Sequence, residues 1–168
     1  MKSIVASVLL LAVVPAITYA AGRHGLILDT VGPVASATPA PGTNGALVVY
    51  SAFDVSGHFQ GIPQHLYHTD YEIRSDNDKV LRTVHNDSDT VVPGPAEVVL
   101  PPGKYRVVAQ ANGYGKVIVP VEVRSGLTTI VHLEGGGDWK TGTRPPPENA
   151  VLLPSGQRVG WKAASKSW

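Results

Sequence analysis

This sequence of 168 residues contains no cysteine. Disulfide bonds, thiolate metal ligands, disulfide redox chemistry and a lipid-modified N-terminal cysteine are therefore excluded. Small exported proteins often depend on disulfides for their stability. If this chain is exported, its stability must come from core packing and from the pairing of strands.

Excess charge is also nearly absent, because the formal net charge is +1 at pH 7 with histidine neutral. This balance argues against a nucleic-acid partner. The charges are unevenly placed: residues 21–137 hold eight Lys/Arg against eleven Asp/Glu, and residues 138–168 hold five against two. All three tryptophans lie in the second stretch. The sequence predicts a mildly acidic domain followed by a basic, aromatic tail.

A long hydrophobic run is missing, since spanning a bilayer takes about 20 apolar residues. The run Ile4–Val14 is shorter, follows the positive charge of Lys2 and ends before Pro15. Residues 18–20 (TYA) supply the small residues that a signal peptidase inspects. We therefore expect residues 1–20 to be a cleaved signal peptide and the protein to be exported, periplasmic or extracellular. The alternative is a retained membrane anchor.

Sustained helical periodicity is absent beyond the signal segment. The chain instead alternates apolar and polar residues in short segments bounded by glycine and proline, which is typical of strands. The expected strands cover residues 25–29, 46–52, 69–75, 79–85, 97–100, 105–112, 116–124 and 127–133. Residues 33–44, 53–67 and 86–95 are expected to be loops.

The expected strands predict an all-β fold, an antiparallel β-sandwich of the prealbumin or immunoglobulin type. Tyr71 and Ile73 share one face of their strand, and the valines at 117, 119, 121 and 123 share one face of theirs. Pro120 cannot donate a ladder hydrogen bond, which predicts an edge or a bulge. Ser125 and Gly126 are expected to form a two-residue hairpin loop.

Four segments follow from this pattern. We expect a signal peptide at 1–20, a leader strand and linker at 21–45, the β-sandwich at 46–135 and a loosely structured tail at 136–168. Within the tail, residues 151–161 (VLLPSGQRVGW) fit one small hairpin around Pro154, Ser155 and Gly156.

Three short motifs carry a resemblance to known families. They are LPPGKY at 100–105, AQANGY at 109–114, and VEVRSG at 121–126 followed by two threonines at 128–129. This pattern resembles the carboxypeptidase regulatory-like, PEGA-type and transthyretin-like sandwich modules of exported bacterial proteins, over about residues 46–134. In those families a PxGxY turn leads into a strand, a GY turn follows and a GxT turn opens the last strand. The resemblance implies an accessory module without shared catalytic residues.

The best metal candidate is the set His58, His65, His68 and Asp70. Imidazole and carboxylate groups are suitable ligands for zinc or copper. The spacing matches no established metal motif, however, and histidines are common in exposed loops. A hydrolase triad of Ser51, His85 and Asp87 has no glycine-framed serine to support it. His132 is expected to lie outward or at a rim.

The tail offers a second candidate surface, because Trp139, Trp161 and Trp168 lie among basic residues and tryptophan is enriched at binding hot spots. Termini are usually poorly ordered, and this favours the alternative that Trp161 covers an apolar patch of the sandwich while the rest of the tail frays.

Two functions from different classes follow. The first is an exported, non-catalytic β-sandwich module, without a cofactor, that binds or supports an envelope protein or polysaccharide through strand edges and loops. The alternative is a small zinc- or copper-binding or hydrolytic protein that uses the loop from His58 to Asp70. A third option is assembly, in which an edge strand pairs with a second copy.

Overall fold

The structure is a computed structural model that describes residues 25–33, 42–54, 67–86, 94–135 and 147–163. Apart from one short 3-10 turn, η1 (Pro147–Asn149), the regular elements of these residues are all β-strands. The prediction of an all-β fold is therefore confirmed. None of the described segments forms a helix of the length and apolarity that crossing a bilayer would take. The expected signal peptide lies outside the described residues.

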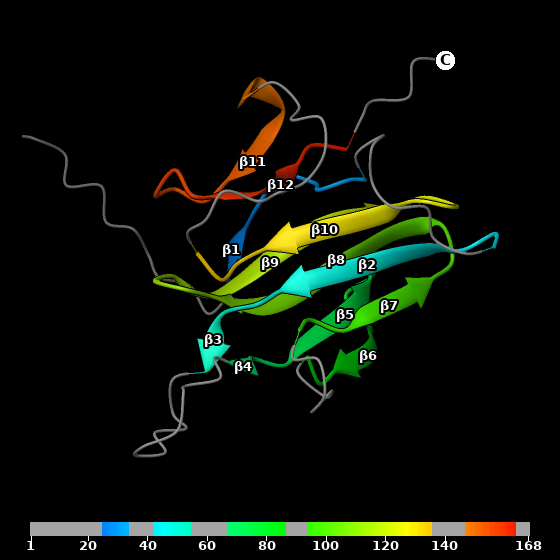
Figure 1. The fold of residues 1–168 in the computed structure, drawn as a ribbon, viewed down its shortest axis with the longest axis horizontal. Coiled ribbons are helices and arrows are strands. Elements are labelled where there is room, and N and C mark those ends of the chain that lie inside the picture. The colour runs from blue at the N-terminus through cyan, green and yellow to red at the C-terminus, as the bar shows by residue number, and fades with distance from the viewer. Residues whose placement is uncertain (1–24, 34–41, 55–66, 87–93, 136–146, 164–168) are drawn as a thin grey trace, which may run out of the picture.

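Two sheets make up the body of the fold (Figure 1). The larger sheet has the order β1-β9-β8-β5-β6, with β1 (Leu26–Ile27), β5 (Tyr71–Ser75), β6 (Val80–Val84), β8 (Gly103–Ala111) and β9 (Gly115–Val123). The smaller sheet has the order β10-β2-β7, with β2 (Gly45–Tyr50), β7 (Glu97–Leu100) and β10 (Thr128–His132). Two short ladders join β3 (Phe53–Asp54) to β4 (Tyr67–His68) and β11 (Ala150–Leu152) to β12 (Arg158–Trp161).

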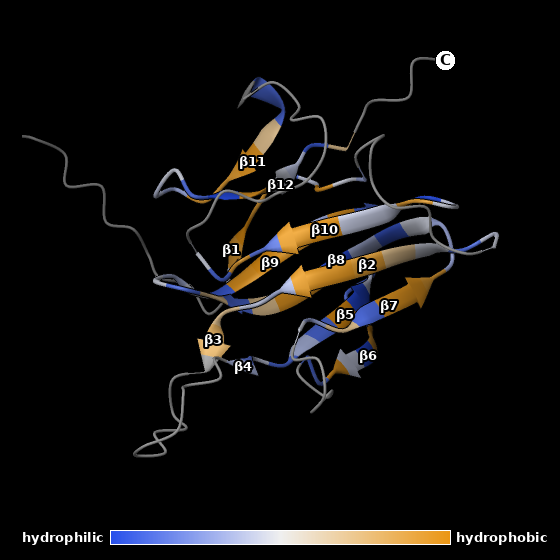
Figure 2. Cartoon of the chain, in the orientation of Figure 1, coloured by the Kyte–Doolittle hydropathy of each residue, from blue (hydrophilic) through white to orange (hydrophobic). Residues whose placement is uncertain are grey.

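The two sheets share one hydrophobic core. Strand alternation sends every second side chain inward, and Figure 2 shows hydrophobic colour concentrated on β2, β9 and β10. The core joins Leu47 and Val49 of β2 and Val131 of β10 to the inner face of the larger sheet. The expected faces are confirmed, because Tyr71, Ile73 and the valines at 117, 119, 121 and 123 are all buried.

Strand pairing is mixed, so the prediction of an antiparallel sandwich is wrong in two places. β10 pairs with β2 in parallel, and β1 pairs with β9 in parallel. The predicted hairpin at Ser125 and Gly126 is also wrong, because β9 belongs to the larger sheet and β10 to the smaller one. A tight turn with Gly126 at φ 70° is present, but it carries the chain from one sheet to the other. Two alternating segments joined by two residues are compatible with a hairpin within one sheet and equally with a turn between two sheets.

Pro120 lies where the parallel ladder beside β9 is interrupted, as its missing N–H predicts. Ile27 is the partner of Ile118, and Val31 is the partner of Val121. Between these two pairs the N-terminal segment advances four residues and β9 advances three. The N-terminal segment therefore has one extra residue, which is a β-bulge. The amide of Val31 donates to the carbonyl of Pro120 at 2.8 Å, so the proline keeps its acceptor in use.

The C-terminal segment is ordered where the structure describes it, so the prediction of a loosely structured tail is wrong for residues 147–163. The expected small hairpin is present as β11 and β12. Val151, Leu153 and Val159 belong to the core cluster, and Trp161 is only 8% exposed. The hairpin lies against the N-terminal segment, where Val31 bridges Lys162 on one side and Val121 on the other.

Candidate functional site

The candidate metal set is described only at His68 and Asp70, since His58 and His65 lie outside the described residues. The Nδ1 atom of His68 lies 2.7 Å from the carbonyl oxygen of Ser51. The imidazole ring of His68 stacks on Phe53 with ring centroids 4.8 Å apart. Asp70 instead accepts from Nδ1 of His85 at 2.7 Å. Within the described residues no three His, Asp or Glu side chains are grouped to hold a metal ion.

The serine of the candidate triad has a structural role. Ser51 is fully buried, and its hydroxyl donates to the carbonyl oxygen of Thr69 at 2.5 Å and accepts from the Asn86 amide at 2.8 Å. His85 is highly exposed and contacts Asp70 rather than Ser51. Asp87 lies outside the described residues. The hydroxyl of Ser51 is therefore committed to holding strands together.

His132 lies on the face of β10 that points away from the core, as expected, but it is buried there. Its ring stacks on Tyr50 with centroids 4.5 Å apart, and its Nδ1 lies 2.7 Å from Oε1 of Glu134. Burial, with a smaller contribution from the nearby charge of Glu134, raises the pKa of Tyr50 above its ordinary value. Alternation along β10 is kept, because Val131 pairs with Val49 on the core side while His132 pairs with Tyr50 on the opposite face.

Trp161 is the described member of the aromatic tail set. Its ring is buried, and the guanidinium carbon of Arg158 lies 4.9 Å from the ring centroid. This placement matches the alternative in which Trp161 covers an apolar patch. Trp139 and Trp168 lie outside the described residues, so their partner-binding role stays a prediction.

A groove opens where the larger sheet forks. The ladder between β5 and β8 ends at the pair Glu72 and Val108, while β8 and β9 stay paired as far as Ala111 and Gly115. Beyond the fork the backbone of Ala52 fills the gap: its amide donates to the carbonyl of Gln110 at 2.9 Å, and its carbonyl accepts from Thr69 at 2.8 Å. The fork therefore has a fixed width.

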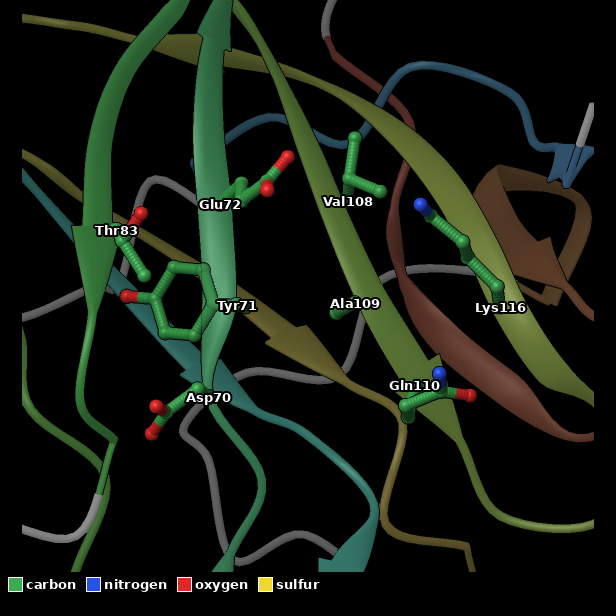
Figure 3. A pocket seen from close by; sticks show the side chains of 8 residues that line it. All are labelled: Asp70, Tyr71, Glu72, Thr83, Val108, Ala109, Gln110 and Lys116. Carbon is green, nitrogen blue, oxygen red and sulfur yellow. The ribbon is translucent and has the colours of Figure 1, made fainter.

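The groove encloses about 220 Å³ and takes its lining from four strands of one sheet and the residue before β5. The lining residues are Asp70, Tyr71, Glu72, Thr83, Val108, Ala109, Gln110 and Lys116. Figure 3 shows Glu72 of β5 and Lys116 of β9 on either side of Val108, with Gln110 further along β8. Acidic, basic and neutral polar side chains thus surround a small apolar floor.

The carboxylates of the groove are held by neighbours outside it. Oε2 of Glu72 accepts from two nitrogens of Arg74, at 2.6 and 2.9 Å, and these contacts raise the pKa of Arg74. Asp70 is held in turn by His85. Among the described residues no hydrogen bond or ion pair engages the side chains of Thr83, Gln110 or Lys116. The groove therefore presents three polar side chains that fold contacts do not use.

A buried polar network centres on Asn86, which follows β6 and is fully buried. The Asn86 amide nitrogen donates to the carbonyl of Val49 at 2.7 Å as well as to Ser51, and its oxygen accepts from the amide of Ala96 at 3.2 Å. Asn86 thereby joins the end of β2 to the segment that leads into β7. Full satisfaction of such a network makes the arrangement rigid.

This groove has no direct signal in the sequence. Sequence pattern makes Asp70 a candidate only as a metal ligand, and it makes Glu72, Gln110 and Lys116 ordinary outward residues of three strands. The only available indication was alternation, which placed Glu72 opposite Tyr71 and Gln110 opposite Ala109. Which strands become neighbours, and where they separate, depends on pairing that alternation does not specify.

No family model, curated protein or solved structure matches this chain. The resemblance to the carboxypeptidase regulatory-like, PEGA-type and transthyretin-like modules therefore stays a prediction.

Proposed function

We propose that this chain is an exported, non-catalytic β-sandwich module that binds a component of the cell envelope through the groove at the fork. The observation that carries the proposal is the groove itself. It is a recess of fixed width whose Thr83, Gln110 and Lys116 side chains are not used by the fold. Ligand sites in general place a few polar groups around an apolar surface in this way.

The resemblance supports the same proposal through the structural role of its motifs. The hydroxyl of Tyr105 donates to the carbonyl of Pro101 at 2.8 Å, which explains why the turn needs a tyrosine four residues after its first proline. The glycine turn at Gly113 follows β8, and Gly126 precedes β10. These turns lie where the resemblance expects them, and we assign the chain to that kind of module as part of the proposal.

Export and binding can be tested together on the protein recovered from its native host. N-terminal sequencing should find Ala21 first, as cleavage after Ala20 requires. The secreted chain should then co-sediment with the isolated envelope of that host. Substitution of Gln110 and Lys116 by alanine should reduce the bound fraction, whereas Lys104→Ala should not. Lys104 is the matched control because it is an exposed residue of β8 outside the groove.

Equal co-sedimentation of all variants would remove the groove from the proposal, and no co-sedimentation of the unaltered chain would remove envelope binding. An unprocessed N-terminus on protein that stays in the cell would contradict export.

A further inference from the structure

Resting on this proposed function, we infer that the groove at the fork binds one ring of a neutral saccharide chain. The inference names the ligand class from three properties of the groove: its volume, the balance of its charges and the kinds of hydrogen-bonding group that line it.

The volume suits a single small ring. Sites for drug-sized ligands span about 300–1,000 Å³, whereas this groove encloses about 220 Å³. An apolar track continues from its floor, because Val108, Ile118 and Ile27 are in register across β8, β9 and β1. Ile27 is 64% exposed. A polymer longer than one ring has a surface to follow on the same face of the sheet.

The charges favour an uncharged ligand. Glu72 forms an ion pair with Arg74, and Asp70 accepts a hydrogen bond from His85, so both carboxylates are held in place. A cationic ligand would meet Lys116 and compete with Arg74, and an anionic ligand would meet two carboxylates. Like charges brought together repel, and solvent screening reduces the effect at these partly exposed side chains. A neutral ligand meets neither penalty.

The hydrogen-bonding groups match hydroxyls. Carboxylates accept only, ammonium groups donate only, and amide and hydroxyl side chains do both. The groove offers acceptors on Glu72 and Asp70, a donor on Lys116 and both kinds on Thr83 and Gln110. A sugar hydroxyl both donates and accepts, so a ring with several hydroxyls can use all of them. Because the carboxylates are already fixed, less ordering entropy is lost on binding.

A peptide strand fits the groove less well. Strand addition needs a free sheet edge, and the groove lies inside the sheet between β5 and β8. The nearest backbone groups at the fork, the carbonyl of Gln110 and the amide of Thr69, already bond to Ala52. Peptide capture is therefore an outcome of the test and not the proposal.

The test is a titration of the secreted chain, followed by backbone amide NMR and by calorimetry. The probes are maltohexaose, cellohexaose and the hexamer of N-acetylglucosamine, with an oligogalacturonate as the anionic counterpart. At least one neutral probe should shift the amides of residues 70–72, 83 and 108–116. Gln110→Ala and Lys116→Ala should each weaken binding about five- to tenfold, the effect of losing one net hydrogen bond. Lys104→Ala should change binding less than twofold.

The inference is overturned if no neutral probe binds, if only the oligogalacturonate binds, or if the groove substitutions leave affinity unchanged. Envelope co-sedimentation that depends on Gln110 and Lys116 without any saccharide binding would sink the saccharide and keep the proposed function. Saccharide binding by a chain that does not co-sediment with its own envelope would do the reverse.

Discussion

The sheet edges on the two lateral sides of the molecule are covered to different extents. On one side, which we term the closed side, residues 25–33 and 147–163 lie along β9 and β10: Val31 bridges β9 to Lys162, and the amide of Gly32 donates to Trp161 at 2.9 Å. On the other, the open side, β6 and β7 are the outermost described strands of their sheets. Both carry exposed apolar side chains, at Val80, Leu81 and Val99.

This difference suits the two sides to different roles: the closed side stabilises the fold, and the open side leaves strand edges accessible. The closed side joins residues more than a hundred positions apart, so its pairing is non-local and raises the contact order of the fold. The open side keeps its edges short, and Leu81 is an extra residue that bulges β6 between its pairs with β5. Short, bulged edges resist pairing with other chains. The groove at the fork lies between the closed side and the open side, beside β5 and β6.

Removing residues 147–168 should have the largest effect on stability. Four large buried side chains leave with the hairpin, Val151, Leu153, Val159 and Trp161, and each contributes about 1.5–3 kcal/mol by burial alone. We expect a loss of more than about 5 kcal/mol, enough to unfold a marginally stable domain. Urea denaturation followed by circular dichroism measures it.

The methyl group added by Gly160→Ala tests the contact between the C-terminal hairpin and Val31. A Cβ at Gly160 would lie 2.6 Å from a methyl carbon of Val31 and 3.2 Å from the carbonyl of Ile130. Gly160→Ala should therefore cost about 1–3 kcal/mol, the usual range for overpacking. Leu152→Ala is the control, because Leu152 is an exposed residue of the same hairpin.

Full stability of the truncated chain would mean that the closed side does not hold the fold together.

Asn86→Ala should have an intermediate effect at the other side of the molecule. It leaves the carbonyl of Val49, the hydroxyl of Ser51 and the amide of Ala96 without their side-chain partner. Buried groups left unsatisfied cost about 1–3 kcal/mol, so we expect a loss of about 2 kcal/mol in urea unfolding. Neighbouring His85→Ala removes an exposed side chain and should change stability by less than about 0.5 kcal/mol. Equal effects of both substitutions would show that the network is dispensable.

Local pattern predicted the strands well and their neighbours poorly. The valine faces at 117–123, the hairpin of 69–75 with 79–85 and the break at Pro120 all follow from alternation or from one missing N–H. The parallel pairing of β2 with β10 does not, because it joins residues 46–50 to residues 128–132 and depends on the register of both sheets. The ordered C-terminal hairpin was readable as a hairpin, but nothing in its sequence placed it against Val31.

The candidate site was predicted less well than the fold. Apart from Asp70, its polar residues are ordinary outward positions of four strands, and they become a site only because the ladder between β5 and β8 ends at Glu72. The Asn86 network lies in part in a segment expected to be a loop, since Asn86 looks like a turn former until its three partners are known. Histidine spacing drew attention to the loop at 58–68 instead, and its metal role stays a prediction for His58 and His65.

Tyr71→Phe should have the smallest effect at neutral pH and a clear one in alkali. The Tyr71 hydroxyl is buried, and none of the described residues bonds to it. Removing an unpaired hydroxyl costs little, so stability at pH 7 should change by less than about 1 kcal/mol. Burial, opposed in part by the charge of Arg82, raises the pKa of Tyr71 well above its ordinary value of 10.0.

The direction of the alkaline effect follows from proton linkage. Unfolded Tyr71 loses its proton above pH 10 while the folded residue keeps it, so the folded state binds more protons there. Stability should be unaffected below pH 10 and should fall above it by as much as about 1.4 kcal/mol per pH unit until the folded pKa is reached. Urea unfolding between pH 8 and pH 11 should give a smaller fall for Tyr71→Phe than for the unaltered chain. The remaining slope belongs in part to Tyr50 and Tyr105, whose pKa values burial also raises. Parallel curves for the two chains would mean that Tyr71 reaches water in the folded state, and that the floor of the groove is more open than its packing indicates.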